Sequence, residues 1–159
     1  MLLLFSVVLI AINGLVSGQC SSCTPVFQTC PPTGGLCNKL DTAVANHPYD
    51  KVINFYMPQY LSPAQLNGIS CGGCSQIRLR HITITGVSGM PGGLNNPYYS
   101  QGGSYDVQNG DTIGCARFCG TPLVPGLYPV TVYLSADVTA IGTPIGNVDA
   151  NNQAQSYKD

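Results

Sequence analysis

The sequence predicts an all-β fold: an antiparallel β-sandwich or open barrel, stabilised by disulfides, with one or two single-turn helices. Short runs of β-branched and aromatic residues recur along the chain between turn residues, which include many of its 19 Gly and 12 Pro. The chain also has 8 Cys, an even number typical of disulfide-bonded domains in oxidising compartments. Its 159 residues fit a single domain of ordinary size.

Residues 1–18 are typical of a signal peptide. Residues 2–12 are almost all apolar, and a short stretch of small residues follows up to Gly18. A membrane-spanning helix needs about 20 apolar residues, whereas Asn13 and Gly14 interrupt this run. We therefore expect a secreted, extracellular protein whose mature chain begins near Gln19.

The composition argues against two classes of partner. Charged residues make up 8% of the chain and the net charge is −1, whereas an average domain is about 25% charged. Basic side chains supply most of the affinity for nucleic acids and for anionic membranes. We therefore expect neither nucleic acid nor a membrane as a partner once the signal peptide is removed.

Residues 19–50 form a cysteine- and proline-rich segment that we expect to be a stapled loop. Prolines remove backbone donors and glycines favour turns, so this segment is a poor candidate for a sheet interior. Within it, Asp41–Asn46 predicts one short helix with Asp41 as the N-cap, ending before Pro48.

Residues 51–150 form the expected β-sandwich body, which begins with a strand at Val52–Tyr56. Ser62–Gln65 predicts a helical turn, limited by Gly68. In Ile77–Thr85 the apolar alternation slips by one residue at Arg80-His81, which predicts a β-bulge at His81.

The centre of the body combines a loop with a hairpin. Gly86–Gly103 lacks both periodicities and predicts a long surface loop, of a length that is often functional. Asn109-Gly110 is a strong hairpin signal and predicts that Ser104–Gln108 pairs with Asp111–Ala116.

The end of the body carries the clearest strand. Apolar and polar residues alternate from Val130 to Thr139, which predicts a half-buried antiparallel strand opened by Pro129. A turn at Ile141–Pro144 precedes a short edge strand at Ile145–Val148, and residues 151–159 form a polar C-terminal tail.

We expect the cysteines to form up to four structural disulfides, with the connectivity left open. Two Cys-x-x-Cys pairs offer alternatives: a four-thiolate zinc site, or a thiol–disulfide centre at Cys71 and Cys74. Oxidation outside the cell disfavours zinc, and the strand-like sequence after Cys74 lacks the helix that stabilises reactive thiolates. The disulfide cysteines are Cys20, Cys23, Cys30, Cys37, Cys71, Cys74, Cys115 and Cys119.

Catalytic machinery is not apparent, and we expect that the protein is not an enzyme and binds neither a cofactor nor a metal. His81 with an aspartate and a serine would supply the parts of a hydrolase triad, but no nucleophile motif accompanies them. Aromatic faces next to amide side chains suit sugars or protein partners, although tyrosines are also commonly part-buried. The candidate binding residues are Tyr98, Tyr99, Tyr105, Asn95 and Asn96.

The segment Gln19-Cys20-Ser21-Ser22-Cys23-Thr24-Pro25, after a signal peptide, resembles the start of small secreted cysteine-rich proteins of nematodes. The resemblance covers the beginning of the mature chain and implies an extracellular domain without assigned activity. We therefore expect a secreted, non-catalytic binding module that recognises an extracellular protein or glycan through residues 86–103. The alternatives are a self-associating structural component of an extracellular matrix or surface coat, and an extracellular thiol-disulfide or zinc protein that uses Cys71 and Cys74.

Overall fold

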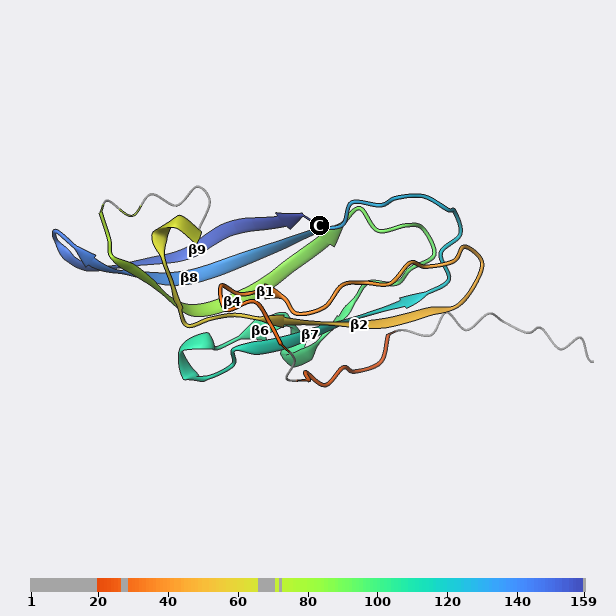
Figure 1. The fold of residues 1–159 in the computed structure, drawn as a ribbon, viewed down its shortest axis with the longest axis horizontal. Coiled ribbons are helices and arrows are strands. Elements are labelled where there is room, and N and C mark those ends of the chain that lie inside the picture. The colour runs from red at the N-terminus through yellow and green to blue at the C-terminus, as the bar shows by residue number, and fades with distance from the viewer. Residues whose placement is uncertain (1–19, 27–28, 66–70, 72, 159) are drawn as a thin grey trace, which may run out of the picture.

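The computed structural model describes residues 20–26, 29–65, 71 and 73–158, with residues 152–158 described as backbone. The expected signal peptide lies outside the described residues. Within them, two antiparallel sheets form the fold, as the sequence predicts (Figure 1). Sheet A has the order β1 (Gly35–Leu36), β2 (Tyr49–Tyr56), β7 (Ile113–Gly120), β5 (Tyr98–Tyr99). Sheet B has the order β3 (Tyr60–Leu61), β4 (Gln76–Ser88), β8 (Thr131–Thr143), β9 (Gly146–Lys158), and β6 (Ser104–Tyr105) also pairs with β4.

The main core lies on the inner face of sheet B. Alternate residues of β4 and β8 bury their side chains there, because successive side chains of a strand point to opposite faces. Phe55 of β2 reaches this core from sheet A and makes an edge-to-face contact with Tyr105, with ring centroids 5.5 Å apart. The buried members of the core are Met57, Leu61, Cys74, Ile77, Leu79, Ile82, Tyr105, Val107, Ala136 and Val138.

The β-bulge expected at His81 is present. The pairing of β4 with β8 shifts between Leu79 and His81, so that Leu79 and Ile82 both face the core although their spacing is odd. A second shift, which the apolar alternation does not predict, lies between Ile84 and Gly86.

The Asn109-Gly110 hairpin is a wrong prediction. β6 pairs with β4 in sheet B, whereas β7 pairs with β2 in sheet A, so the chain crosses between the sheets at this point. The connection contains the 3₁₀ turn η3 (Val107–Asn109), and Gly110 closes that turn with a φ of 110°. The fully buried Tyr105 and Val107 explain the difference, because burying both side chains outweighs a local hairpin preference.

The loop expected at residues 86–103 is shorter in the structure. Residues 86–88 complete β4, Tyr98 and Tyr99 form β5, and the 3₁₀ turn η2 (Ser100–Gly103) follows. Irregular backbone is therefore confined to residues 89–97, apart from an isolated bridge between Leu94 and Gly120. The pairing of β5 with β7 provides backbone hydrogen bonds that the sequence does not reveal.

The helix expected at Asp41–Asn46 is also wrong. Asp41 pairs with Lys51, with 2.5 Å between Oδ2 and Nζ, instead of capping a helix. Asn46 has a φ of 63° and ends a turn that no helix could continue through. By contrast, the helical turn at Ser62 is confirmed as η1 (Pro63–Gln65), where the Ser62 N–H donates to Gln65 Oε1 at 2.6 Å.

The long strand expected from Val130 is confirmed and continues to Thr143 as β8. The strand expected at Ile145–Val148 is far longer, because β9 pairs with β8 along its whole length. The polar residues 151–158 therefore belong to sheet B. None of the helical turns in the described part of the chain has the length and apolar character needed to cross a membrane.

Candidate interaction surface

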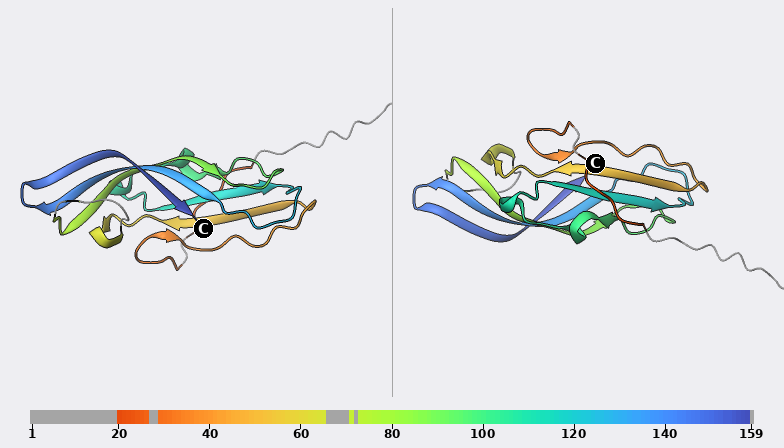
Figure 2. Two further views of the ribbon diagram at one scale, coloured as in Figure 1. Left: turned by 90° about the horizontal axis from the view of Figure 1, so that it is seen from above. Right: turned by 90° about the horizontal axis from the view of Figure 1, so that it is seen from below.

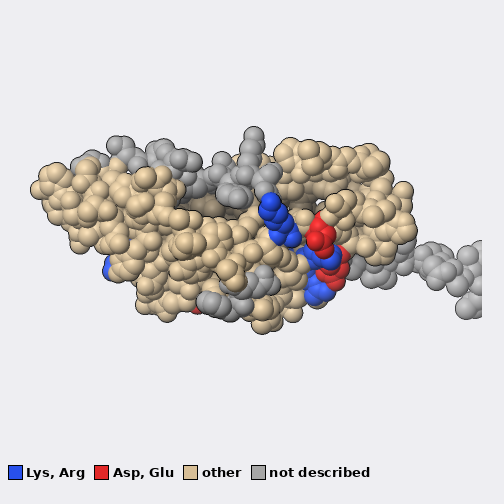
Figure 3. All heavy atoms as spheres, in the orientation of Figure 1, with Lys and Arg blue, Asp and Glu red and all other residues tan. Residues whose placement is uncertain are grey.

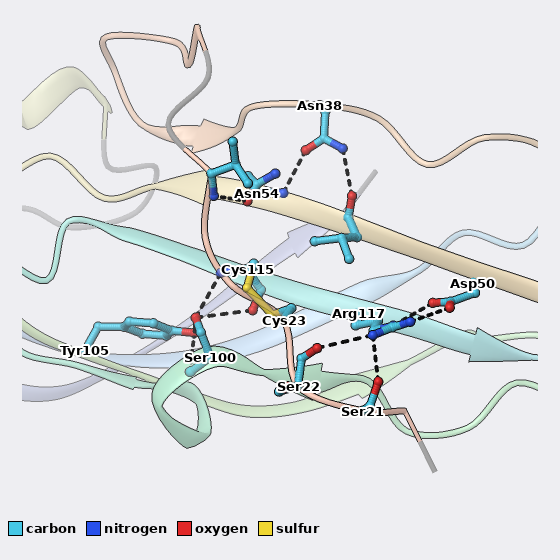
Figure 4. Close-up of a disulfide and its surroundings, with 12 residues drawn as sticks. Ser21, Ser22, Cys23, Asn38, Asp50, Asn54, Ser100, Tyr105, Cys115 and Arg117 are labelled. Atoms are coloured by element: carbon cyan, nitrogen blue, oxygen red, sulfur yellow. Dashed lines mark hydrogen bonds and ion pairs between the residues drawn. A yellow bond between two sulfur atoms is a disulfide. The ribbon is translucent and has the colours of Figure 1, made fainter. Parts of the chain in front are cut away.

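The outer face of sheet A is occupied by the chain's own N-terminal segment, residues 20–26. Cys23 is bonded to Cys115 (Figure 4). Cys20 is bonded to Cys119, so two disulfides attach this segment to β7. The Val26 N–H then donates to the side chain of Asn54 on β2 at 3.0 Å. This face of the sandwich is therefore unavailable to a partner where the segment lies.

An ion pair between neighbouring strands helps to hold the N-terminal segment. Arg117 of β7 donates from Nε to Asp50 of β2 at 2.7 Å and from Nη1 to Ser21 Oγ at 2.6 Å. The hydrogen bond from Arg117 lowers the pKa of Asp50, outweighing the effect of burial. The pair is exposed at the surface, so we assign it a positioning role and little net stability.

The disulfide pairing rules out the four-thiolate zinc alternative. Cys20 and Cys23 are bonded to β7, and Cys71 is bonded to Cys74, so the two Cys-x-x-Cys pairs do not meet. The remaining bond joins Cys30 to Cys37. All eight cysteines are therefore disulfide-bonded in the structure, as expected.

The candidate tyrosines have separate environments. Tyr105 is fully buried and its hydroxyl donates to the Ser100 carbonyl oxygen at 2.8 Å, so in this structure it offers no surface to a partner. Tyr99 packs against the smaller core of sheet A, and burial raises the pKa of its phenol to about 12. Tyr98 alternates with Tyr99 in β5 and is 40% exposed at the edge of sheet A. Of the three, only Tyr98 has much surface to offer a partner.

The candidate asparagines lie just before β5. The Asn95 N–H donates to the Cys119 carbonyl oxygen at 2.9 Å, which extends the pairing of this segment with β7. Asn95 is partly buried, whereas Asn96 is exposed. Asn96 and Tyr98 therefore lie on the accessible part of the expected binding loop.

Three loops meet at the end of the molecule opposite the turn between β8 and β9, and we call residues 43–48, 89–97 and 121–130 the loop end (Figures 1 and 2). Backbone hydrogen bonds join them: the Thr121 N–H donates to Gly93 O at 2.9 Å and the Asn46 N–H donates to Pro122 O at 2.7 Å. The positions of the three loops are thus coupled.

The loop end exposes aliphatic side chains. Leu123, Val124 and Leu127 are 58%, 59% and 99% exposed, and all three belong to residues 121–130. Val44 adds an exposed aliphatic side chain from residues 43–48. Exposed apolar side chains are ordinary when scattered, but a group of them on adjoining loops is typical of an interaction surface.

The loop end is also uncharged. Its three segments contain no Lys, Arg, Asp or Glu, and the corresponding region of Figure 3 carries neither colour of charge. A depression at its border is lined by Val44 and His47 of the loop end and by Asp41 and Lys51 next to it, among others, and includes the Asp41–Lys51 ion pair. The surface therefore combines an apolar centre with a polar border, the usual anatomy of a protein interface.

The structure also brings together a histidine and a serine, two of the three residue types of a hydrolase triad. His81 Nε2 lies 2.9 Å from Ser104 Oγ, and the backbone of His81 is opposite Asp137. The pair lies at the exposed surface of sheet B, where a transition state would remain hydrated instead of being surrounded by preorganised dipoles. The absence of enzymatic activity stays a prediction.

Residues 121–130 were not predicted to form part of a functional surface. Their signal was available as an aperiodic run of leucine, valine and proline without a charge, which is unusual for a surface loop. No protein-family model, curated protein or solved structure matches the chain. The resemblance of the N-terminal segment thus stays a prediction.

Proposed function

We propose that this protein is a secreted, non-catalytic binding module that recognises an extracellular protein through its loop end. The observation that carries the proposal is the group of exposed aliphatic side chains on an uncharged surface, centred on Leu123, Val124 and Leu127. Four disulfides are compatible with an extracellular location, because such bonds persist in oxidising surroundings.

A protein partner fits this surface better than a glycan does. Sugar rings stack on aromatic faces, but Tyr99 and Tyr105 are largely or fully buried. Burial of leucine or valine in an apolar pocket instead lowers the free energy of the complex, because it removes apolar surface from water. Complete burial of a fully exposed leucine contributes about 1.5–3 kcal/mol. Leu127 is therefore the expected anchor, and Asn96 and Tyr98 would contribute at the border.

The test compares variants at opposite ends of the sandwich. The secreted chain is screened against panels of extracellular proteins and of glycans, and each hit is measured with Leu127→Asp and Ile145→Asp. Ile145 is the matched control because it is 85% exposed at the turn between β8 and β9. We expect a protein hit whose affinity falls at least about tenfold in Leu127→Asp, by loss of apolar burial, and is unchanged in Ile145→Asp.

Two results would contradict the proposal. Binding to glycans alone would contradict a protein partner and would point to Tyr98 and Asn96 as the binding residues. Equal affinities of the two variants would exclude the loop end as the binding site. Secretion is checked separately by sequencing the N-terminus of the protein in the medium, which we expect near Gln19.

A further inference from the structure

One sheet edge of this protein differs from the others. The outer edges formed by β1, β5, β3 and β6 each consist of strands of 2 residues. β9 has 13 residues and is the last strand of sheet B, paired with β8 on one side. Short edge strands protect sheets against pairing with other chains, whereas a long edge presents a row of backbone donors and acceptors.

We propose that β9 pairs with β9 of a second copy of the chain, antiparallel and about a two-fold axis. Such a contact is isologous, so each copy supplies the same strand and every contact occurs twice. It would join the two copies of sheet B into one continuous sheet. The features that favour a second copy as the occupant are the register of β9 and the position of its charges.

The register is set by a bulge in β9. Ala136 pairs with Gln153 and Val138 with Ala150, so Asn151 and Asn152 together lie opposite the single residue Asp137. Asp149 lies opposite Thr139 and Lys158 opposite Thr131. Because those threonines are an even number of residues apart on β8, the bulge places Asp149 and Lys158 on the same face of sheet B.

A two-fold axis through Ala154 makes this register self-complementary. Gln153 then lies opposite Gln155 of the second copy. Asn151 and Asn152 together lie opposite the single residue Ser156 of the second copy, just as they lie opposite the single residue Asp137 in β8. Asp149 consequently lies opposite Lys158 of the second copy, on the same face, and the axis repeats this pair. These are the only charged residues in β9, and opposite charges at directly opposed positions stabilise an antiparallel pair.

Other features of the chain permit the contact. β9 contains no proline, which would remove an edge donor. A net charge of −1 gives two copies little mutual repulsion. Asp149 is positioned on this face by Thr139, whose hydroxyl donates to it at 2.5 Å, and by Arg80, whose Nη1 lies 3.9 Å from Asp149 Oδ2. The carboxylate still has surface exposed to a second cation, because 60% of its side chain is accessible.

The dimer would be closed and bivalent. The two-fold contact uses the only long edge of the described strands, so it ends at two copies and does not continue into a filament. The loop end adjoins the start of β8, and the start of β8 is paired with the C-terminal end of β9. Each loop end therefore lies near the C-terminal end of its own β9. Antiparallel pairing therefore places the two loop ends at opposite ends of the dimer. If the proposed function holds, the dimer can bridge two partners.

The first test is sedimentation of the chain over the micromolar range, with Ala154→Pro and Gln155→Pro as a matched pair. Successive N–H groups of a strand point to opposite edges, so one of these prolines removes a bond to β8 and the other removes a donor from the free edge. We expect the parent chain to dimerise. The proline variant that keeps the parent's melting temperature should be monomeric.

A charge exchange then tests the register. Lys158→Asp should weaken the dimer about tenfold by placing two carboxylates opposite each other twice, and Asp149→Lys combined with Lys158→Asp should restore it. A parent chain that stays monomeric, or a dimer that survives in the well-folded proline variant, would overturn the proposal. A dimer lost in Leu127→Asp but insensitive to the β9 variants would also overturn it, and would leave the loop end as the self-association surface.

Discussion

Gly93 lies directly against Thr121: a Cβ atom at position 93 would be 2.0 Å from the Thr121 carbonyl oxygen. Gly93 also has a φ of 94°, which L-residues rarely adopt. Two loops far apart in the sequence can therefore join at the loop end only if this position is glycine.

Gly93→Ala is expected to lower the free energy of unfolding by about 1–3 kcal/mol, because it combines a left-handed backbone with a backbone contact that cannot move aside easily. It should also speed hydrogen exchange in residues 121–130, whose N–H groups at Thr121 and Leu123 donate to Gly93 and Gly92. Both effects are measured against Gly92→Ala. An added Cβ at Gly92 meets no atom within 4 Å and its φ is not left-handed, so that control should behave as the parent.

The two disulfides between the N-terminal segment and β7 are expected to be strongly non-additive. Cys20–Cys119 and Cys23–Cys115 close chain separations of 99 and 92 residues, and either one alone keeps the long loop closed in the unfolded chain. Removing one bond should therefore cost only about 2 kcal/mol of loop-closure entropy, whereas removing both should cost about 7 kcal/mol.

Urea unfolding of the two pairwise Ala variants and of the fourfold variant measures this coupling. The Cys71–Cys74 bond spans a separation of 3 residues and serves as the control, and its removal should cost about 1–2 kcal/mol of loop-closure entropy. Simple additivity of the two long bonds would contradict the argument. The Cys23 variant should cost somewhat more than the Cys20 variant, because Cys115 is fully buried and its loss leaves a cavity.

The regular strands could be predicted because their periodicity is local. The alternation of apolar and polar residues from Val130 to Thr139 predicted β8. The one-residue slip of the apolar alternation at Arg80-His81 predicted the β-bulge. Asn109-Gly110 failed because its local preference competes with the burial of Tyr105 and Val107, whose partners lie in a different sheet. Pairing across sheets depends on contacts between distant residues, which a single sequence does not display.

The disulfide connectivity carried one usable signal. Cys115 and Cys119 are an even number of residues apart on one strand, so both point to the same face and one segment can bond to both. Identifying that segment as residues 20–26 needed the fold. The loop end as a whole was not predicted, because its three segments are far apart in the sequence and a single sequence does not show which loops lie side by side.

Tyr99 and Tyr105 are expected to respond in opposite ways to loss of the hydroxyl. Among the described residues no group accepts or donates a hydrogen bond to the buried Tyr99 hydroxyl, whereas Tyr105 donates to the Ser100 carbonyl oxygen at 2.8 Å. Tyr105→Phe should cost about 1–3 kcal/mol because it leaves buried acceptors unpaired, and Tyr99→Phe should be neutral or stabilising. Denaturant midpoints of the two variants decide this, and a clear loss in Tyr99→Phe would mean that its hydroxyl has a partner.

Tyr99 should also weaken the protein at alkaline pH. Burial, the largest cause, and the neighbouring Tyr105 raise the pKa of Tyr99 from 10.0 to about 12 in the folded state. The unfolded chain therefore loses this proton first, so the contribution of neutral Tyr99 to stability is fully present below pH 10 and declines as the pH rises from 10 to about 12. Unfolding free energies measured across that interval should fall less steeply in Tyr99→Phe than in the parent chain. Equal slopes would show that the phenol of Tyr99 ionises as readily in the folded protein as in the unfolded chain.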